Sequence, residues 1–449
     1  MKMIYNLNDK PKFPQLIVFA IQQLLAIMAA TLVVPVIVGN GMQPAAALFG
    51  AGVGTIVYQL FTKFKSPVFL GSSFAFLGSM AAAFAGAVSV QVGYLGLIIG
   101  AVFAGLVYVI IALVVKFCGV GWVNKLMPAV VIGPTVAIIG LSLAGNAVGD
   151  LQTTKVADAD GKMLTSPYVA IICGLVTLAV TMLCSTYGKK MLKLIPFVMG
   201  ILAGYAVGSI FTVIGIATGN DALRVIDFSI FASMGSIVSL PEFTFVTALK
   251  GVSEINGSYI ATVAVAYVPV AFVVFAEHIA DHKNLSTIIE KDLLEEPGLH
   301  RTLLGDGVGS MAGAFFGGCP NTTYGESVGC VAITRNCSVI TITAAAIGAI
   351  LISFITPFVT FVNSIPSCVM GGVCMALYGF IAVSGLKMIQ KVDLEKNRNL
   401  FVVSVILIAG IGGLTLSFGK VTLTSIACAL ILGILANVML SKEKDEVAE

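Results

Sequence analysis

Apolar runs separated by short polar segments extend along almost the whole chain. Each run is close to the length of about 20 residues that an α-helix needs to cross a bilayer, and about fourteen runs can be counted. They cover residues 14–38, 44–62, 67–88, 92–117, 128–149, 167–185, 195–217, 258–280, 299–317, 319–335, 339–362, 367–388, 400–418 and 421–440. The pattern predicts an all-α polytopic membrane protein with about fourteen transmembrane segments.

The amino-acid composition supports the prediction of a membrane protein by excluding other classes of protein. Of the 449 residues, 58% are hydrophobic and 10% are charged, whereas about 25% of a soluble domain is charged. A soluble protein is therefore excluded. The formal net charge of +3 does not indicate a nucleic-acid partner, and the nine cysteines lie mostly within apolar runs, as small buried side chains do.

The basic residues indicate how the segments are oriented. If the N-terminus is cytoplasmic, only five of the 25 lysines and arginines fall on the outer side, namely Lys155, Lys162, Arg224, Lys250 and Lys420. Basic residues concentrate in cytoplasmic loops of membrane proteins. We therefore expect a multi-pass membrane protein in contact with lipid, with both termini in the cytoplasm.

Two of the runs contain residues that disfavour a continuous helix. The third segment, SPVFLGSSFAFLGSMAAAF (66–84), begins with β-prone residues and passes a Gly–Ser cluster, and the tenth, GGCPNTTYGESVGCVAITR (317–335), contains Pro320. Each is the third segment of one half of the chain. An odd number of spans per half makes the halves inverted, and paired interruptions of this kind mark the midplane site of secondary transporters. We predict two inverted repeats of seven, with short β-strands and half-helices in segments 3 and 10.

Acidic side chains occur inside otherwise uncharged stretches near these interruptions. Glu277 ends the run AVAYVPVAFVVFAE, and Glu326 follows the break in segment 10. A carboxylate near the bilayer centre costs at least about 2.5–3.5 kcal/mol and usually faces a cavity or a partner. Short helices that begin at the same depth direct free N–H groups toward whatever lies between them. Together these features predict a substrate site that accepts and donates hydrogen bonds without a basic side chain.

Other kinds of site fit the sequence less well. His278 and His282 have the i, i+4 spacing of a zinc pair, but Glu277 precedes the first histidine, so the H-E-x-x-H pattern is absent and no metal is expected. The stretches GAGVG (50–54) and GDGVGSMAG (305–313) lack the strand–turn–helix context of a dinucleotide loop and are interpreted as helix-packing glycines. Because no nucleophile or metal constellation is found, we expect neither catalytic residues nor an enzyme.

Several stretches resemble those of bacterial uracil permeases, which belong to the nucleobase–ascorbate transporter family, also called nucleobase:cation symporter family two. They are FLGSSFAFLGSM, AEHIADH, EKDLLEEPGLHRTLLGDG and PNTTYGESVGCVAITR. The similarity extends along nearly the whole chain, and PNTTYGE is fairly specific because purine-type members usually differ there. The resemblance implies a location in the bacterial plasma or inner membrane, a core domain, a gate domain, an elevator-like movement and a homodimer. We place the core at residues 1–126 and 251–363, and the gate at 127–250 and 364–449 with the cytoplasmic tail.

The resemblance also assigns residues to a uracil site. It implies that Glu277 and Glu326 bind uracil and that Phe74 lines the pocket. Tyr324 and Gly325 are implied to present backbone amides, and Ala26 to close the other side. Further residues are expected to support the site, namely Gln23, Ser73, Thr323 and His278.

Proton coupling is the least determined part of this assignment. The family has a polar or ionisable residue four positions after Glu277, histidine in the best-known uracil permease pattern and Asp281 here. Gln23 stands where many members have histidine. We therefore assign coupling to Asp281 and Glu277, with H⁺ as the coupling ion and no cofactor.

Uracil suits such a site because it is flat and neutral and carries both N–H donors and carbonyl acceptors. Carboxylates accept hydrogen bonds from N–H groups, helix amides donate to carbonyls, and an aromatic ring covers one face. The sequence therefore predicts a uracil–proton symporter. The alternatives are a carrier of another nucleobase, such as xanthine, a purine or thymine, and an anion transporter of the same architecture. A channel is disfavoured because no TVGYG-type filter occurs.

Overall fold

The structure is a computed structural model that describes residues 3–119, 128–158, 160, 162–189, 191–418 and 421–442. The first half contains α1 (Phe13–Val38), α2 (Pro44–Phe61), β1 (Leu70–Ser72), α3 (Leu77–Ala85), α4 (Val90–Cys118), α6 (Ala129–Ser142), α7 (Ala144–Leu151), α8 (Pro167–Tyr187), α9 (Met191–Leu194), α10 (Pro196–Thr218), η1 (Asp221–Leu223), α11 (Ser229–Ala232), α12 (Thr244–Leu249) and η2 (Val252–Glu254). The second half contains α13 (Gly257–Ile289), η3 (Leu294–Gly298), α14 (Leu299–Gly317), β2 (Asn321–Thr323), α15 (Gly325–Thr334), α16 (Val339–Ile352), α17 (Thr356–Ser364), α18 (Ser367–Ile389), α19 (Asn397–Ile411), β3 (Leu416–Phe418), β4 (Val421–Leu423), α20 (Ser425–Met439) and η4 (Leu440–Lys442).

Long apolar helices confirm a polytopic membrane protein. Among the described residues, eight helical stretches are long and apolar enough to span a bilayer. They are α1, α2, α4, the pair α6–α7, α8, α10, α13 and α18. Helices α16, α19 and α20 are apolar but shorter. The interrupted segments add no long span because α3 and α15 have only 9 and 10 residues.

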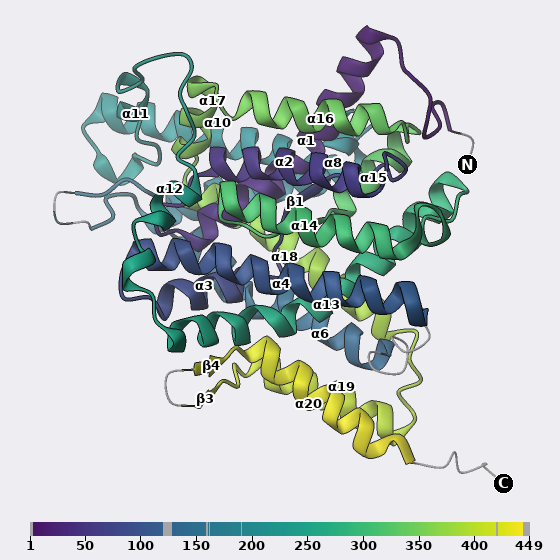
Figure 1. Ribbon diagram of the computed structural model, residues 1–449. Helices are drawn as coiled ribbons and strands as arrows, with labels where there is room; N and C mark the ends of the chain where they lie inside the picture. The colour runs from purple at the N-terminus through teal and green to yellow at the C-terminus, as the bar shows by residue number, and fades with distance from the viewer. Residues whose placement is uncertain are drawn as a thin grey trace.

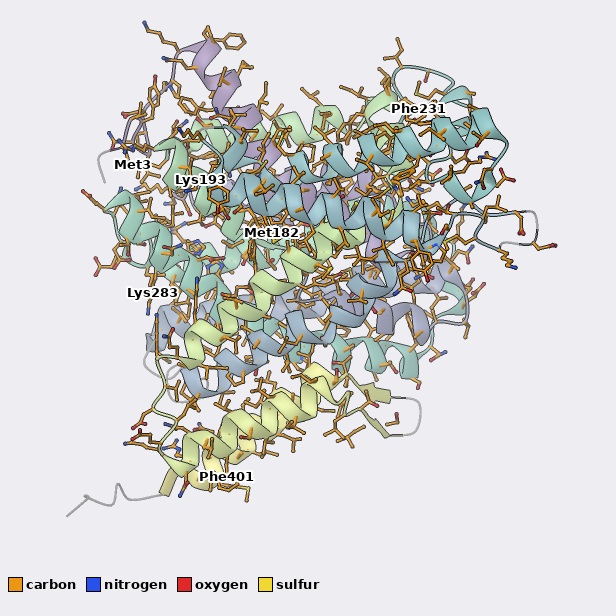
Figure 2. The ribbon with its side chains drawn as sticks, turned by 180° about the vertical axis from the view of Figure 1, so that it is seen from behind. Met3, Met182, Lys193, Phe231, Lys283 and Phe401 are labelled. Carbon is orange, nitrogen blue, oxygen red and sulfur yellow. The ribbon has the colours of Figure 1, made fainter. Side chains whose placement is uncertain are left out.

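The outer surface of the bundle is apolar, as contact with lipid requires. Side chains such as Phe117, Ile408 and Met439 are 78%, 74% and 78% exposed, which would be unfavourable in water but not against acyl chains. In Figure 2, Lys193 and Lys283 lie at the same end of the molecule as Met3, whereas Phe231 lies at the opposite end. The N-terminal segment, α9 and the end of α13 that carries Lys283 thus lie at one end of the bundle, and α11 lies at the other.

The two interrupted segments meet in the interior. Strand β1 pairs antiparallel with β2, with Leu70 opposite Thr323 and Ser72 opposite Asn321. Both strands are buried, so each satisfies the other's backbone polar groups where no water is available. Each strand is followed by a short helix, α3 after β1 and α15 after β2, which confirms the predicted strand and half-helix in both segments.

Glycines bring α2 and α14 into close contact. A Cβ atom added at Gly50 would lie 2.5 Å from the carbonyl oxygen of Gly313, and one added at Gly54 would lie 2.7 Å from that of Gly309. Such distances allow only backbone-to-backbone packing, which is typical of helix contacts in membranes. The interpretation of both glycine-rich stretches as helix-packing elements is therefore confirmed.

The described helices pack as two sets. Helices α1 to α4 pack with α13 to α16, and helices α6, α7, α8 and α10 pack with α18, α19 and α20. In Figure 1, α19 and α20 (yellow) lie along one edge beside the hairpin β3–β4. That hairpin pairs Leu416 with Leu423, and α13 packs against both β4 and α20, so the two sets also contact each other.

Replacing Gly313 with alanine tests this packing. Its Cβ would lie 2.1 Å from Nδ2 of Asn321, and overpacking of this kind costs about 1–3 kcal/mol. We expect Gly313→Ala to lower the thermal unfolding midpoint of the purified protein. Gly145→Ala on α7, where nothing lies within 4 Å of the new methyl group, is the control and should leave the midpoint unchanged or raise it. Equal midpoints for the two variants would contradict the packing described.

Candidate functional site

A cavity of about 360 Å³ lies where the two sets of helices face each other. One wall comes from the interrupted segments and α13, and the opposite wall from α6, α10 and α18. The lining residues are Ser73, Phe74, Ala75, Ile139, Phe197, Glu277, Asp281, Thr322, Thr323, Tyr324, Gly325, Glu326, Leu377, Phe380, Ile381 and Ser384. None of these described residues is basic.

The three acidic side chains of the cavity come from two helices. Glu277 and Asp281 lie one turn apart on α13, and Glu326 lies in the first turn of α15. This arrangement confirms that Glu277 and Asp281 share a helix face and places Glu326 opposite them in the same cavity. The site therefore offers several carboxylate oxygens to a bound molecule.

The histidines of α13 occupy its other face and are completely buried. His278 and His282 stack with their ring centroids 4.0 Å apart. Nδ1 of His278 lies 2.8 Å from Oδ2 of Asp306, and Nε2 of His282 lies 2.7 Å from the hydroxyl of Tyr58. Both histidines are thus hydrogen-bonded structural residues that hold α13 against α14 and α2. Across the described ranges, no three His, Cys, Asp or Glu side chains come together as metal ligands.

Asp306 was not anticipated as part of this arrangement. It lies on α14 within the glycine-rich stretch, is 1% exposed, and is linked through His278 to Thr323 of the cavity wall, whose hydroxyl lies 3.3 Å from Nδ1. In the sequence, Asp306 appears only as a single carboxylate between two glycines, Gly305 and Gly307. Its partner is 28 residues away, so spacing alone could not reveal the pair.

Tyr324 forms hydrogen bonds within the protein through both its backbone amide and its hydroxyl group. Its backbone N–H donates to the carbonyl of Phe69 at 3.3 Å, and its hydroxyl donates to the carbonyl of Ser72 at 2.6 Å. The prediction that this residue presents a backbone amide to a ligand is therefore wrong, because the amide extends the β1–β2 pairing. Helix α15 begins at Gly325, so the amides without a helical partner start there.

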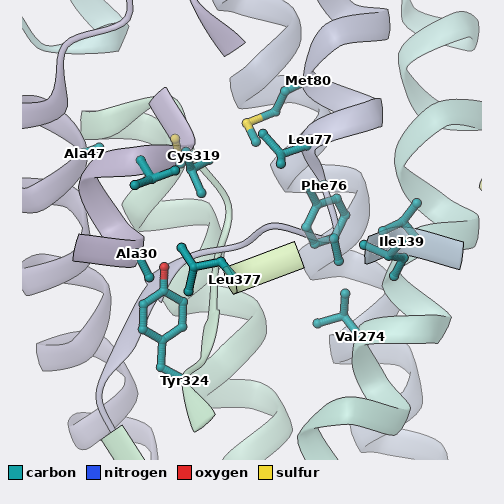
Figure 3. Close-up of a cluster of buried hydrophobic side chains, with 14 of the residues drawn as sticks. Ala30, Ala47, Phe76, Leu77, Met80, Ile139, Val274, Cys319, Tyr324 and Leu377 are labelled. Carbon is teal, nitrogen blue, oxygen red and sulfur yellow. The ribbon is translucent and has the colours of Figure 1, made fainter. Parts of the chain in front are cut away.

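The tyrosine ring belongs to the buried cluster shown in Figure 3. There it lies beside Leu377, which belongs to α18 and lines the same cavity. The ring also approaches Gly71 so closely that an added Cβ would lie 2.4 Å from it. Tyr324 therefore fixes the start of α15 by its ring, its hydroxyl and its amide.

Two predicted site residues of α1 do not line the cavity. Gln23 is buried, and its side-chain amide donates to the hydroxyl of Ser327. Ala26 packs in a small cluster with Leu194 and Cys330. Gln23 therefore contacts α15 without lining the cavity, and the roles expected for Gln23 and Ala26 stay predictions. Ser73, Phe74 and Thr323 lie in the wall, as expected.

The wall facing the carboxylates is mostly apolar. Phe197 of α10 and Phe380 of α18 meet edge to face, with ring centroids 6.0 Å apart, and Phe74 meets Tyr378 in the same manner at 6.1 Å. Except for Ser384, the lining side chains of α6, α10 and α18 carry no hydrogen-bonding group. The cavity thus combines a polar wall with an aromatic and aliphatic one, as a flat polar ring requires.

Comparison with known proteins identifies the family. A sequence profile described as "Permease family" matches residues 14–418. The chain belongs to this permease family. A permease carries its substrate across a membrane without converting it, so the prediction of a transporter rather than an enzyme is confirmed.

Two uracil permeases are similar in sequence to this chain along nearly its whole length. The uracil permease of Bacillus subtilis (strain 168) is 38% identical over 100% of this chain and 98% of its own. The uracil permease of Escherichia coli (strain K12) is 35% identical over 96% of this chain and 92% of its own. Among solved structures, the transmembrane domain of the cyanobacterial bicarbonate transporter BicA has a TM-score of 0.63 at 15% identity, covering 96% of this chain and 100% of that one. The permease therefore shares its fold with an anion transporter.

Removal of the Ser327 hydroxyl tests how the start of α15 is held. That oxygen accepts hydrogen bonds from Gln23 and from the amide of Phe69, which is 3.2 Å away, and both donors are buried. A buried donor left without a partner costs about 1–3 kcal/mol, so Ser327→Ala should clearly lower the thermal unfolding midpoint. Ser142→Ala is the matched control, because its hydroxyl only donates to a carbonyl of its own helix. A Ser327→Ala midpoint within the range of this control would refute the arrangement.

Proposed function

We propose that the protein imports uracil across the plasma or inner membrane in symport with protons. The observation that carries the proposal is the cavity in which Glu277, Asp281 and Glu326 lie beside the first free amides of α15. The uracil permeases of Bacillus subtilis and Escherichia coli, similar over nearly the whole chain, support uracil as the substrate.

The chemistry of the cavity matches that of uracil group by group. Glu277 and Glu326 accept from the two ring N–H groups, and the amides at the start of α15, from Gly325 onward, donate to a carbonyl. Phe74 covers one face of the ring. A site built on specific hydrogen bonds rejects an analogue lacking them by about 10⁴-fold in good cases. Cytosine, in which an amino group replaces a carbonyl, places a donor against donors and is therefore excluded.

Protons are proposed to enter through the same carboxylates. Glu277 and Asp281 line the cavity on one face of α13, where removal from water favours the neutral form of a carboxyl group. We assign the coupling proton to Asp281, with Glu277 as its neighbour, and assume no other cofactor. Collapse of the proton gradient then abolishes accumulation.

The architecture proposed for transport follows the two sets of helices. We assign α1 to α4 and α13 to α16 to a core domain that carries the substrate, and the remaining long helices to a gate domain. These domains belong to fourteen segments in two inverted repeats of seven, with both termini cytoplasmic and a homodimer in lipid. The proposed boundary at residues 126 and 127 lies outside the described residues. Transport is then an elevator-like shift of the core against the gate.

Two other classes of substrate, other nucleobases and anions, are weighed against uracil. A purine or xanthine, or thymine, presents a similar polar edge and is separated from uracil by competition. An anion is disfavoured even though the fold is shared with a bicarbonate transporter, because three carboxylates and no basic side chain line the described cavity. A negative substrate would be repelled there.

Truncation of Glu326 tests the substrate site. Loss of hydrogen bonds to a charged acceptor costs about 1.5–3 kcal/mol each, so Glu326→Ala should weaken uracil binding at least about tenfold while leaving the unfolding midpoint nearly unchanged. Glu295→Ala, at an exposed position outside the cavity, is the control. Binding of labelled uracil to the purified protein, competed by cytosine, thymine, xanthine and bicarbonate, gives both affinity and specificity. Unaltered affinity in Glu326→Ala would contradict the role of Glu326 in the site. Stronger competition by another compound would contradict uracil as the substrate.

Neutralising Asp281 separates coupling from binding. Asp281→Asn retains hydrogen-bonding capacity but cannot release a proton, so we expect uracil affinity within about threefold of the parent and a loss of concentrative uptake. Uptake into vesicles is measured with and without a protonophore. The parent should lose accumulation when the gradient collapses, and the variant should be insensitive. Accumulation that survives the protonophore in the parent would rule out proton coupling.

A further inference from the structure

Residues 3–9, here called the strap, precede α1 and run alongside the loop that joins α15 to α16. Tyr5 of the strap pairs with Asn336 of this loop in a parallel β-bridge. The flanking backbone hydrogen bonds join the amide of Ile4 to the carbonyl of Arg335 (2.8 Å), the amide of Cys337 to the carbonyl of Tyr5 (3.0 Å) and the amide of Val339 to the carbonyl of Leu7 (3.1 Å). The strap is therefore hydrogen-bonded along the whole loop, from the end of α15 to the start of α16.

Side chains also fix the position of the strap. The hydroxyl of Ser338 donates to the carbonyl of Asp9 at 2.6 Å, and the carboxylate of Asp9 accepts from the amide of Asn6 at 2.7 Å. The hydroxyl of Tyr5 donates to Oε1 of Gln15 on α1 at 2.6 Å. The strap thus connects α1 to the loop after α15 in one defined arrangement.

Leu7 anchors the strap in the interior. Its side chain is 8% exposed and belongs to a buried apolar cluster that includes Val328 and Val331 of α15 and Leu70 of β1. Ile4, three residues earlier in the strap, is 60% exposed. Two side chains of equal size in one short segment therefore differ in whether they pack against α15.

Helix α15 depends on such contacts because it is short. It has 10 residues, and an isolated helix of fewer than about 12–15 residues is marginal in water. Arg335, which follows it, has a φ of 54°, a left-handed conformation that residues other than glycine rarely adopt. The start of the helix is held by β2 and by Ser327, whose hydroxyl accepts from Gln23. Its end is held by the strap.

We propose that the strap positions α15 for substrate binding, and that its release lowers the affinity of the site. Glu326 and the first free amides of the cavity belong to the same 10 residues that the strap holds at their other end. A protein binds a ligand more weakly when only a fraction of its molecules have the competent site. The positioning of α15 follows from the contacts alone, whereas the effect on uracil affinity rests on the proposed function.

Hydrogen exchange tests the positioning of α15 without any substrate. Leu7→Ala removes apolar packing against α15, so exchange of the α15 amides should become at least about tenfold faster. Ile4→Ala is the matched control, because it removes an exposed side chain of the same size and keeps the amide that donates to Arg335. Exchange in α20, which belongs to the other set of helices, should be the same in both variants. Unchanged exchange of α15 in Leu7→Ala, or equal changes in the two variants, would overturn the proposal.

Uracil affinity tests the consequence for the site. Coupling between two parts of a protein typically changes affinity about 5–150-fold, so Leu7→Ala should weaken binding of labelled uracil at least about fivefold. The number of sites per protein should stay the same, and so should the order in which other nucleobases compete, because no group of the cavity has changed. Ile4→Ala should bind as the parent does. Parent-like affinity in Leu7→Ala would overturn the effect on the site.

Rescue by a peptide separates positioning from a general loss of stability. In Figure 2, Met3 lies at the end of the molecule that also carries Lys193 and Lys283, where a peptide in solution reaches it. The strap is replaced by a Gly–Ser linker of equal length, and the peptide MIYNLNDKPK (residues 3–12) is added at millimolar concentration, the range of effective concentration that a short linker provides. The peptide should restore slow exchange in α15 and uracil affinity, and the same peptide with Leu7→Ala should not. Equal action of both peptides, or of neither, would refute the role of the strap.

These measurements also distinguish this inference from the proposed function. If the parent protein does not bind uracil, the proposed substrate is overturned, while fast exchange of α15 in Leu7→Ala and its reversal by the peptide in the linker variant still support the strap. If the parent binds uracil and the strap variants exchange and bind as the parent does, the strap is overturned and the uracil carrier stands.

Discussion

The structure depends on one short antiparallel pairing in the interior of the bundle, between Leu70–Ser72 and Asn321–Thr323. Extended backbone inside a membrane protein must find its hydrogen bonds within the protein. Segments from the two halves of the chain can therefore leave the helical state only together. Their pairing determines where α3 and α15 begin, and hence where free amides and Glu326 face the cavity.

The polar and apolar parts of the site come from different sets of helices. The carboxylates and the short-helix amides belong to α13 and α15, and the aromatic wall belongs to α10 and α18. Under the proposed function, a substrate is hydrogen-bonded mainly by the first set and covered mainly by apolar side chains of the second. The proposed shift between the sets then breaks mostly apolar contacts, which are not directional, and the hydrogen bonds to the carboxylates and amides stay within one set.

Much of this architecture was predictable from the sequence because it depends on local patterns. Apolar runs predicted the helices, and Pro320 with the Gly–Ser cluster predicted the strand and short helix in each interrupted segment. Glu277 and Glu326 stood out as charges in uncharged stretches. Contacts between residues far apart in the chain could not be predicted in this way: the amide of Tyr324 is bonded to Phe69, Ala26 packs with Leu194 and Cys330, and Asp306 is bonded to His278. Phe197 and Phe380 were indistinguishable from other apolar residues until packing placed them in one wall.

The stacked histidines have a further mechanical consequence. Because His278 is tied to Asp306 and His282 to Tyr58, while Glu277 and Asp281 occupy the cavity face, each face of α13 is committed to a different environment. Turning this helix about its axis would drive imidazoles toward the substrate and carboxylates into a dry interface. These contacts therefore hold helix α13 in one rotational setting against α2 and α14.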